Sequence, residues 1–278
     1  MRLCIVFITS FLTGVHFQDC ARRAKLYKRK PTSNNKFISI DQHPFIVGLL
    51  KTFEFALQFR CAAVIIHKKW AITTARCMAS DEPSLIYRYW RVRGNTSRYE
   101  GYTDAYSDHR ISSVYIHHNY VGENNSYDYD VALIKVHQLF IGLHEKPICF
   151  ATGFYKYMNN SSLTLLIWKE KNINTYTSAK GELESFDVQL YNFQQCRKLY
   201  RSFGFAIPSR KLCALRLSNT ECTSGWGGPL IRRGILIGLS SMGLECSADH
   251  IPWTYTKLSE FNEWILTTVY DLTIVETK

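Results

Sequence analysis

The cysteines are the residues with the clearest chemistry in this chain. There are nine, and Cys4 lies within an apolar leader, so eight remain, at positions 20, 61, 77, 149, 196, 213, 222 and 246. An even number of cysteines in an oxidising compartment indicates a disulfide framework, although spacing alone leaves the pairing open. No two of the eight lie two to four residues apart, as a metal-binding knuckle requires. We therefore expect disulfides, no metal site and no cofactor.

Serine, histidine and aspartate form the second reactive set. Acyl transfer by a serine hydrolase needs a hydroxyl nucleophile, an imidazole that takes its proton, and a carboxylate that orients the imidazole. The stretch NTECTSGWGGPLI at residues 219–231 contains Ser224. His109, His117 and His118 lie away from this stretch. We interpret these three as surface or core histidines.

The N-terminus has the layout of a secretory signal. In residues 1–18, MRLCIVFITSFLTGVHFQ, Arg2 precedes an apolar run from Leu3 to Val15. No other apolar run reaches the ~18 residues that a membrane span needs. Asn-x-Ser/Thr sequons, which predict glycosylated surface loops, begin at Asn95, Asn124, Asn159 and Asn160. We expect a secreted, extracellular glycoprotein with no stable membrane insertion.

The formal net charge is +11, and residues 19–36 form a basic, polar segment that we interpret as a propeptide-like strap. A basic surface favours acidic partners, such as sulfated glycans or anionic membranes. Secretion argues against nucleic acid as the partner. The partner is thus expected to be an unknown protein or an acidic glycan. The alternative is that the charge only aids solubility.

From residue 37 onward, short apolar and β-branched runs alternate with polar or glycine-containing turns. Examples are FIVGLL, CAAVIIH, WAITTA, YWRVRG, VALIKV, LTLLIW and GILIGL. Such runs predict the strands of a sandwich or barrel. Near the C-terminus, Phe261, Trp264, Ile265 and Val269 share one helical face. We predict an all-β domain over residues 37–270 with one C-terminal helix, and a tail at residues 271–278.

Four stretches resemble the trypsin/chymotrypsin family of serine proteases, in the family's order. They are WAITTARC at 70–77, YDYDVALIKV at 127–136, CTSGWGGPLI at 222–231 and PWTYTKL at 252–258. The first three resemble the stretches carrying the catalytic histidine, aspartate and serine, and the fourth borders the specificity pocket. The resemblance implies two packed six-stranded β-barrels with a cleft between them.

At the catalytic positions, the resemblance places Arg76 for histidine and Trp226 for serine, while Asp130 keeps the aspartate. A guanidinium stays protonated and cannot act as a general base, and an indole is not a nucleophile. The resemblance therefore implies an inactive protease homologue. Having no imidazole to orient, Asp130 is expected to form a buried ion pair with Arg76.

Other functional positions of the family are altered as well. The resemblance places Ser224 at the oxyanion-hole glycine and Gly225 at the aspartate that pairs with the new amino terminus after activation. Thr220 takes the base of the specificity pocket, Trp253 replaces one wall glycine, and Gly243 keeps the other. We expect the Trp253 indole to fill the pocket; the alternative is that it swings outward.

The resemblance also orders the cysteines. It implies the disulfides Cys61–Cys77, Cys196–Cys213, Cys222–Cys246 and Cys20–Cys149, the last of which tethers the strap.

Three functions remain open from the sequence. The first is a secreted, inactive homologue that acts by binding. The second is an unconventional serine-type endopeptidase or hydrolase with a displaced nucleophile, such as Ser224. The third is a polyanion-binding protein that uses RRAKLYKRK at 22–30, for which the alternative is a solvated strap.

Overall fold

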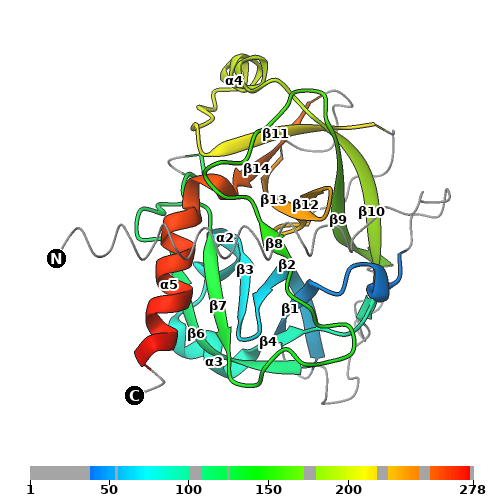
Figure 1. The fold of residues 1–278 in the computed structure, drawn as a ribbon, viewed down its shortest axis with the longest axis vertical. Helices are drawn as coiled ribbons and strands as arrows, with labels where there is room; N and C mark the ends of the chain where they lie inside the picture. Colours follow the sequence, from blue (N-terminus) through cyan, green and yellow to red (C-terminus); the bar gives the residue numbers. More distant parts are fainter. Residues whose placement is uncertain are drawn as a thin grey trace.

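Two closed β-barrels contain most strands of the computed structural model (Figure 1). The structure describes residues 38–53, 56–99, 108–123, 126–171, 180–217, 225–243 and 251–275. Each barrel has six strands joined by antiparallel pairing, as the resemblance predicts.

The first barrel closes in the order β1-β2-β3-β7-β6-β4. Its strands are β1 (Ile46–Phe53), β2 (Ala56–His67), β3 (Trp70–Thr73), β4 (Trp90–Arg93), β6 (Asp108–Ile116) and β7 (Ala132–Val136).

The second barrel runs β11-β14-β13-β12-β9-β10, and pairing of β10 with β11 closes it. Its strands are β9 (Ser162–Lys171), β10 (Lys180–Leu190), β11 (Lys211–Arg216), β12 (Pro229–Arg232), β13 (Ile235–Met242) and β14 (Trp253–Lys257). Two short strands join this sheet from outside the ring. They are β5 (Arg98–Tyr99), which pairs with β10, and β8 (Cys149–Phe150), which is parallel to β13.

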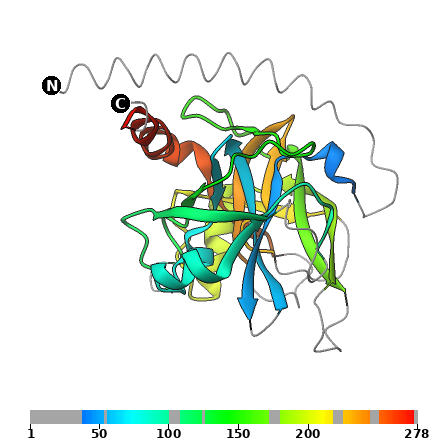
Figure 2. The ribbon, with the colours of Figure 1, turned by 90° about the horizontal axis from the view of Figure 1, so that it is seen from below.

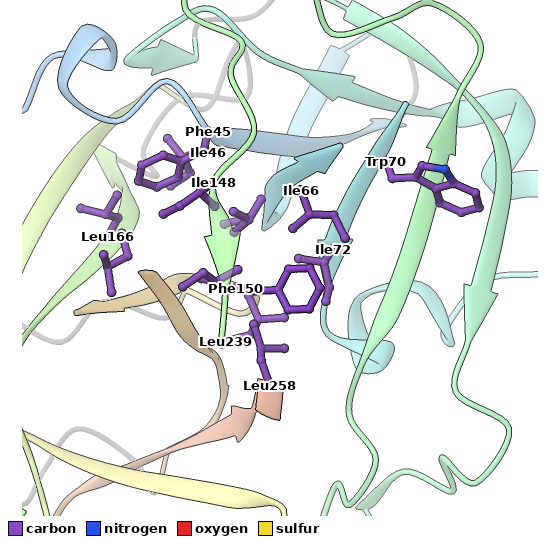
Figure 3. Packing of buried hydrophobic residues seen from close by; sticks show 14 of the residues in the cluster. Phe45, Ile46, Ile66, Trp70, Ile72, Ile148, Phe150, Leu166, Leu239 and Leu258 are labelled. Atoms are coloured by element: carbon purple, nitrogen blue, oxygen red, sulfur yellow. The ribbon is translucent and has the colours of Figure 1, made fainter. Parts of the chain in front are cut away.

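Several strands are buried on both faces, which explains their continuous apolar sequences. In β2, Cys61, Ala63 and Ile65 face one core, while Val64 and Ile66 alternate with them and face another. This second core lies between the barrels, where side chains from both barrels pack together (Figure 3). A strand in this position has no polar face, so CAAVII at residues 61–66 is apolar throughout.

Six helical segments have bounds within the described part of the chain. They are η1 (Ile40–Gln42), α2 (Ala75–Met78), α3 (Pro83–Tyr89), α4 (Phe193–Ser202), η3 (Leu258–Phe261) and α5 (Asn262–Val275). The sequence predicted the C-terminal one, and α2, α3 and α4 are additional.

The C-terminal helix uses the predicted face. Phe261, Ile265 and Val269 are buried in the core between the barrels, and Trp264 packs against it. The helix lies at the edge of the molecule in both views (Figure 1, Figure 2). It continues to Val275, into the segment expected as a tail.

Candidate functional site

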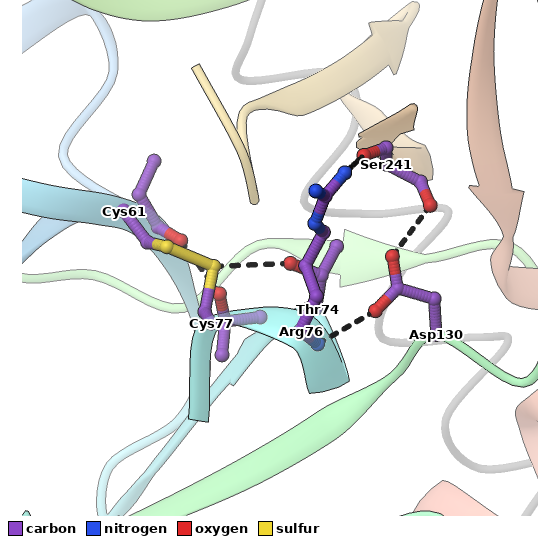
Figure 4. The surroundings of a disulfide bond; sticks show 8 residues. Cys61, Thr74, Arg76, Cys77, Asp130 and Ser241 are labelled. Carbon is purple, nitrogen blue, oxygen red and sulfur yellow. Dashed lines mark hydrogen bonds between the residues drawn. A yellow bond between two sulfur atoms is a disulfide. The ribbon is translucent and has the colours of Figure 1, made fainter. Parts of the chain in front are cut away.

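The residues at the family's catalytic positions meet where the two barrels join. Arg76 lies on α2, directly after β3, and Asp130 lies just before β7, both in the first barrel. Trp226 lies in the turn before β12 of the second barrel. The disulfide Cys61–Cys77 ties α2 to β2 and so fixes the helix that carries Arg76 (Figure 4).

The Asp130 carboxylate is fully buried and fully engaged. Its Oδ1 accepts the backbone N–H of Arg76 at 2.8 Å, and its Oδ2 accepts the Ser241 hydroxyl at 2.5 Å (Figure 4). The Asp130 carbonyl accepts the hydroxyl of Thr256 at 2.8 Å. Because Ser241 and Thr256 belong to the second barrel, Asp130 links the two barrels.

The cation nearest this carboxylate is Lys211 on β11. Its Nζ lies 3.9 Å from Asp130 Oδ2 and donates to Ser241 Oγ at 2.5 Å. Burial lowers the pKa of Lys211 to about 8, although Asp130 and Asp128 act in the opposite direction. Lys211 is 2% exposed, so the pair is closed to solvent.

The expected ion pair between Arg76 and Asp130 is wrong. The Arg76 guanidinium instead donates to the Ser241 carbonyl at 2.8 Å and to the Tyr127 hydroxyl at 3.4 Å. The backbone N–H of Arg76 and the Ser241 hydroxyl each bond one oxygen of Asp130, and Lys211 supplies a positive charge. The Arg76 guanidinium, meanwhile, is held by the Ser241 carbonyl and two aromatic rings.

The guanidinium of Arg76 lies between two aromatic rings. Its carbon is 4.1 Å from the ring centre of Tyr127 and 4.1 Å from that of Trp226. Each cation–π contact of this kind is worth ~0.5–2 kcal/mol. Tyr127 has a φ of 53°, in the left-handed region that tyrosine rarely adopts. Arg76, Tyr127 and Trp226 thus form one stacked group, which we call the Arg76 stack.

The backbone around Trp226 is tightly fixed. The Trp226 carbonyl accepts the N–H of Ala62 on β2 at 2.9 Å, and Gly227 donates to the Ser240 carbonyl at 2.9 Å. A β-carbon on Gly225 would lie 2.4 Å from Ile167 Cγ2, so this position has no room for a side chain. The Trp226 side chain is 41% exposed.

The two described pocket positions lie against each other. A β-carbon on Gly243 would meet ring atoms of Trp253 at 2.8–3.2 Å, so the indole covers this glycine. The Arg216 guanidinium lies over the Trp253 ring, 5.1 Å from its centre. Thr220 and Ser224 lie outside the described residues.

The cysteine pairs that fall within the described chain match those implied by the resemblance. Cys61–Cys77 and Cys196–Cys213 are disulfides. Cys149 is also disulfide-bonded. Its expected partner Cys20, and the expected pair of residues 222 and 246, lie outside the described residues.

Three of the four sequons can be placed. Asn159 and Asn160 are exposed and Asn95 is partly exposed, whereas Asn124 lies outside the described residues. The Oδ1 atom of Asn95 accepts the N–H of His144 at 2.9 Å.

The histidines considered as bases have other partners. His109 is buried, and its Nε2 donates to Glu145 at 2.8 Å. His117 stacks between His118 and Tyr129, and burial lowers its pKa to about 4. Within the described segments, no three His, Cys, Asp or Glu residues gather as a metal site would require. No helix in the described part of the chain is long and apolar enough to cross a membrane.

Sequence reasoning missed Lys211, Ser241 and Tyr127. A signal for Lys211 exists, since a period of two places it on the same face of β11 as Cys213, which is buried. The apolar run around Ser241 indicates burial, but nothing local connects it to a residue 111 positions away.

Comparison with known proteins agrees with this geometry. The family model described as Trypsin matches residues 34–265. Alkaline trypsin B of Manduca sexta is 28% identical over 235 residues, covering 82% of this chain and 86% of that protein. Phenoloxidase-activating factor 1 of Holotrichia diomphalia is 25% identical over 226 residues, covering 75% of this chain and 61% of that protein.

Among solved structures, the crystal structure of the scabies mite inactivated protease paralogue S-D1 superposes with a TM-score of 0.68. The alignment covers 86% of this chain and 97% of that one. At 18% identity, the likeness concerns the fold.

Proposed function

Because this chain belongs to the trypsin family, yet carries the Arg76 stack at the family's catalytic positions, we propose that it acts by binding rather than by hydrolysis. The observation that carries this proposal is the contact of Arg76 with Trp226. On the resemblance, these residues stand for the catalytic histidine and serine. Here a guanidinium and an indole pack on each other at 4.1 Å.

The stack removes the chemistry of acyl transfer. Arg76 has no basic nitrogen free to take a proton, because a guanidinium stays charged in proteins. Trp226 has no nucleophilic atom. Asp130 keeps its position but orients a backbone N–H and a hydroxyl instead of an imidazole. None of the three can play its role in peptide hydrolysis.

The pocket and activation positions also argue against substrate binding and zymogen activation. The Trp253 indole lies against Gly243, where the family's specificity pocket opens. At Gly225, the position of the activation aspartate, Ile167 fills the space that a side chain would need. These changes are separate from the catalytic positions and point the same way.

The alternative is a hydrolase with a displaced nucleophile. Ser241 and Lys211 have the composition of a serine–lysine pair, with 2.5 Å between Oγ and Nζ. However, Ser241 has no exposed surface and its hydroxyl donates to Asp130, so a substrate carbonyl has no access. Burial therefore favours a structural role for this pair. The other candidate nucleophile, Ser224, lies outside the described residues.

The setting that we propose is extracellular. The leader, the sequons and the disulfides support secretion of a glycoprotein, and the net charge of +11 supports an acidic protein or glycan as partner. The scabies mite paralogue, described as inactivated, is an example of an inactivated protease with this fold.

Fluorophosphonate labelling tests the proposal. Secreted, disulfide-bonded protein, before and after trypsin treatment, is expected to remain unlabelled beside an active trypsin control. Labelling of the folded chain would contradict it. The variants Ser241→Ala and Ser224→Ala would then show which serine carries the adduct.

A further inference from the structure

The segment between β7 and β8 carries an exposed apolar surface. Leu139, Ile141 and Leu143 are 40%, 77% and 74% exposed, although all three are large aliphatic residues. The segment passes along the lower edge of the first barrel in Figure 1. We call residues 137–145 the apolar loop. Exposed apolar residues that gather in this way mark an interaction site on a soluble protein.

The apolar loop is held in place from beneath. Phe140 is 2% exposed, and its N–H donates to the Lys68 carbonyl at 2.8 Å. Glu145 is buried and accepts both the N–H of Gly142 and Nε2 of His109, each at 2.8 Å. The backbone that presents Ile141 and Leu143 is therefore already ordered, and contact with a partner does not have to order it.

Exposed cations surround this loop. The Lys68 carbonyl accepts the N–H of Phe140, the Arg110 carbonyl accepts the N–H of His137, and Lys146 directly follows the loop. We call Lys68, Arg110 and Lys146 the cationic rim. All three are exposed, and none forms an ion pair with any residue in the described part of the chain.

Nearby charges reinforce the rim. Arg91 on β4 lies directly opposite Arg110 on β6, an arrangement of like charges that is unfavourable without an anion. Two neighbouring carboxylates are already engaged, since Asp108 pairs with Arg93 and Glu145 with His109. A third carboxylate, Asp41, is exposed and lies near His144 of the loop, so the three rim cations outnumber it and the surface still favours an external anion.

We propose that the apolar loop and the cationic rim dock this protein on an anionic lipid surface. Ile141 and Leu143 enter the interfacial layer, and the rim contacts the headgroup phosphates. The inference rests on the proposed binding function and names an anionic lipid surface as the partner in place of an acidic protein or glycan. Attachment of this kind is peripheral and needs no membrane-spanning helix.

The side-chain types favour lipid over the other acidic partners. A sulfated glycan would match the rim but offers no apolar surface to Ile141 and Leu143. Energetic centres of protein interfaces are enriched in Trp, Tyr and Arg and depleted in Leu. Aliphatic side chains beside Lys and Arg are the pattern that an interfacial lipid layer accepts.

Vesicle co-sedimentation of the full chain tests the proposal. We expect binding to mixed phosphatidylserine–phosphatidylcholine vesicles and little binding to phosphatidylcholine alone. Ile141→Ser with Leu143→Ser should weaken binding by on the order of 10-fold or more. Lys68→Gln with Arg110→Gln and Lys146→Gln should weaken it by on the order of 100-fold at low ionic strength and flatten its salt dependence.

Matched controls lie elsewhere on the surface. Phe154→Ser with Met158→Ser removes two residues that are 84% and 52% exposed, and Arg197→Gln with Lys198→Gln and Arg201→Gln removes three cations from α4. Both control variants should bind vesicles as the unmodified protein does.

Two outcomes would overturn the proposal. They are equal losses of vesicle binding in the control variants, and absence of vesicle binding by the unmodified protein. In the second case, retention on heparin that Ile141→Ser with Leu143→Ser leaves unchanged would point to a glycan partner instead. The result is separable from the fluorophosphonate test, because vesicle binding does not depend on whether the cleft is catalytic.

Discussion

Asp130 remains buried in this chain because groups other than an imidazole satisfy it. The N–H of Arg76 and the hydroxyl of Ser241 each donate to one of its two oxygens, and Lys211 supplies a positive charge at 3.9 Å. A buried carboxylate without such partners would be strongly unfavourable. Lys211 therefore stabilises the buried Asp130 as a charged partner, while the Arg76 guanidinium packs against the aromatic rings of Tyr127 and Trp226.

This arrangement predicts the result of removing Lys211. Lys211→Met should lower the free energy of unfolding by about 3 kcal/mol, because Asp130 would be left as an unpaired buried charge. The double variant Lys211→Met with Asp130→Asn should recover most of this loss, because it removes both charges. Chemical denaturation measures both. An exposed control, Lys198→Met, should change stability by less than about 0.5 kcal/mol. Lys211→Met as stable as the unmodified protein would contradict this role.

At the scale of elements, the turn before β12 needs glycine at position 227. Gly227 has a φ of 77°, and a β-carbon there would lie 2.0 Å from the Ala62 carbonyl oxygen. That oxygen also accepts the Thr73 hydroxyl, at 2.7 Å, so it is fixed by β3. The turn that presents Trp226 therefore depends on this close approach between Gly227 and the Ala62 carbonyl.

Two glycine substitutions separate the cost of a positive φ from the cost of a steric clash with the backbone. Gly204→Ala should cost about 1–2 kcal/mol, because Gly204 has a φ of 82° but no atom within 4 Å of the new carbon. Gly227→Ala should cost more than about 3 kcal/mol, because the backbone carbonyl must move as well. Thermal unfolding of both variants measures the difference. Equal losses would show that the contact with Ala62 relaxes freely.

At the scale of the whole molecule, η3 and α5 dock on the first barrel through aromatic rings. His117 stacks on Tyr129 with 4.8 Å between ring centres, and Phe261 and Trp264 contact the same imidazole. Burial lowers the pKa of His117 to about 4, helped by the charges of His118 and Arg210 and opposed by Asp128. The neutral ring is thus the form that this packing requires.

Acid should loosen this docking. Between pH 6.5 and pH 4, the unfolded chain binds a proton at His117 that the folded chain does not, so stability falls as the pH is lowered through this window. We expect about 2 kcal/mol from this group, measured as the change in unfolding free energy between pH 7 and pH 4. His117→Phe should reduce this change, whereas the exposed control His137→Phe should not. An unchanged pH dependence in His117→Phe would refute the assignment.

The sequence by itself determined the strands and the C-terminal helix, and its resemblance to the trypsin family supplied the two barrels and the residues at the catalytic positions. The spacing of apolar residues along the strands, and the apolar face of Phe261, Ile265 and Val269, indicate which side chains are buried, because this pattern lies within a short stretch of sequence. Helix α4 also has a local signal that could have been used, since Asn192 caps it by accepting the N–H groups of Gln194 and Gln195.

Only the tertiary structure decided how the charges are partnered. The family resemblance places Arg76 and Asp130 at neighbouring catalytic positions, and so predicts an ion pair between them. The fold brings in Ser241 and Lys211 from the second barrel, and these residues, not the Arg76 guanidinium, contact the carboxylate. Burial follows from patterns within a strand, whereas a charge selects its partner by distance and solvent exclusion, and those are set by residues far away in the chain.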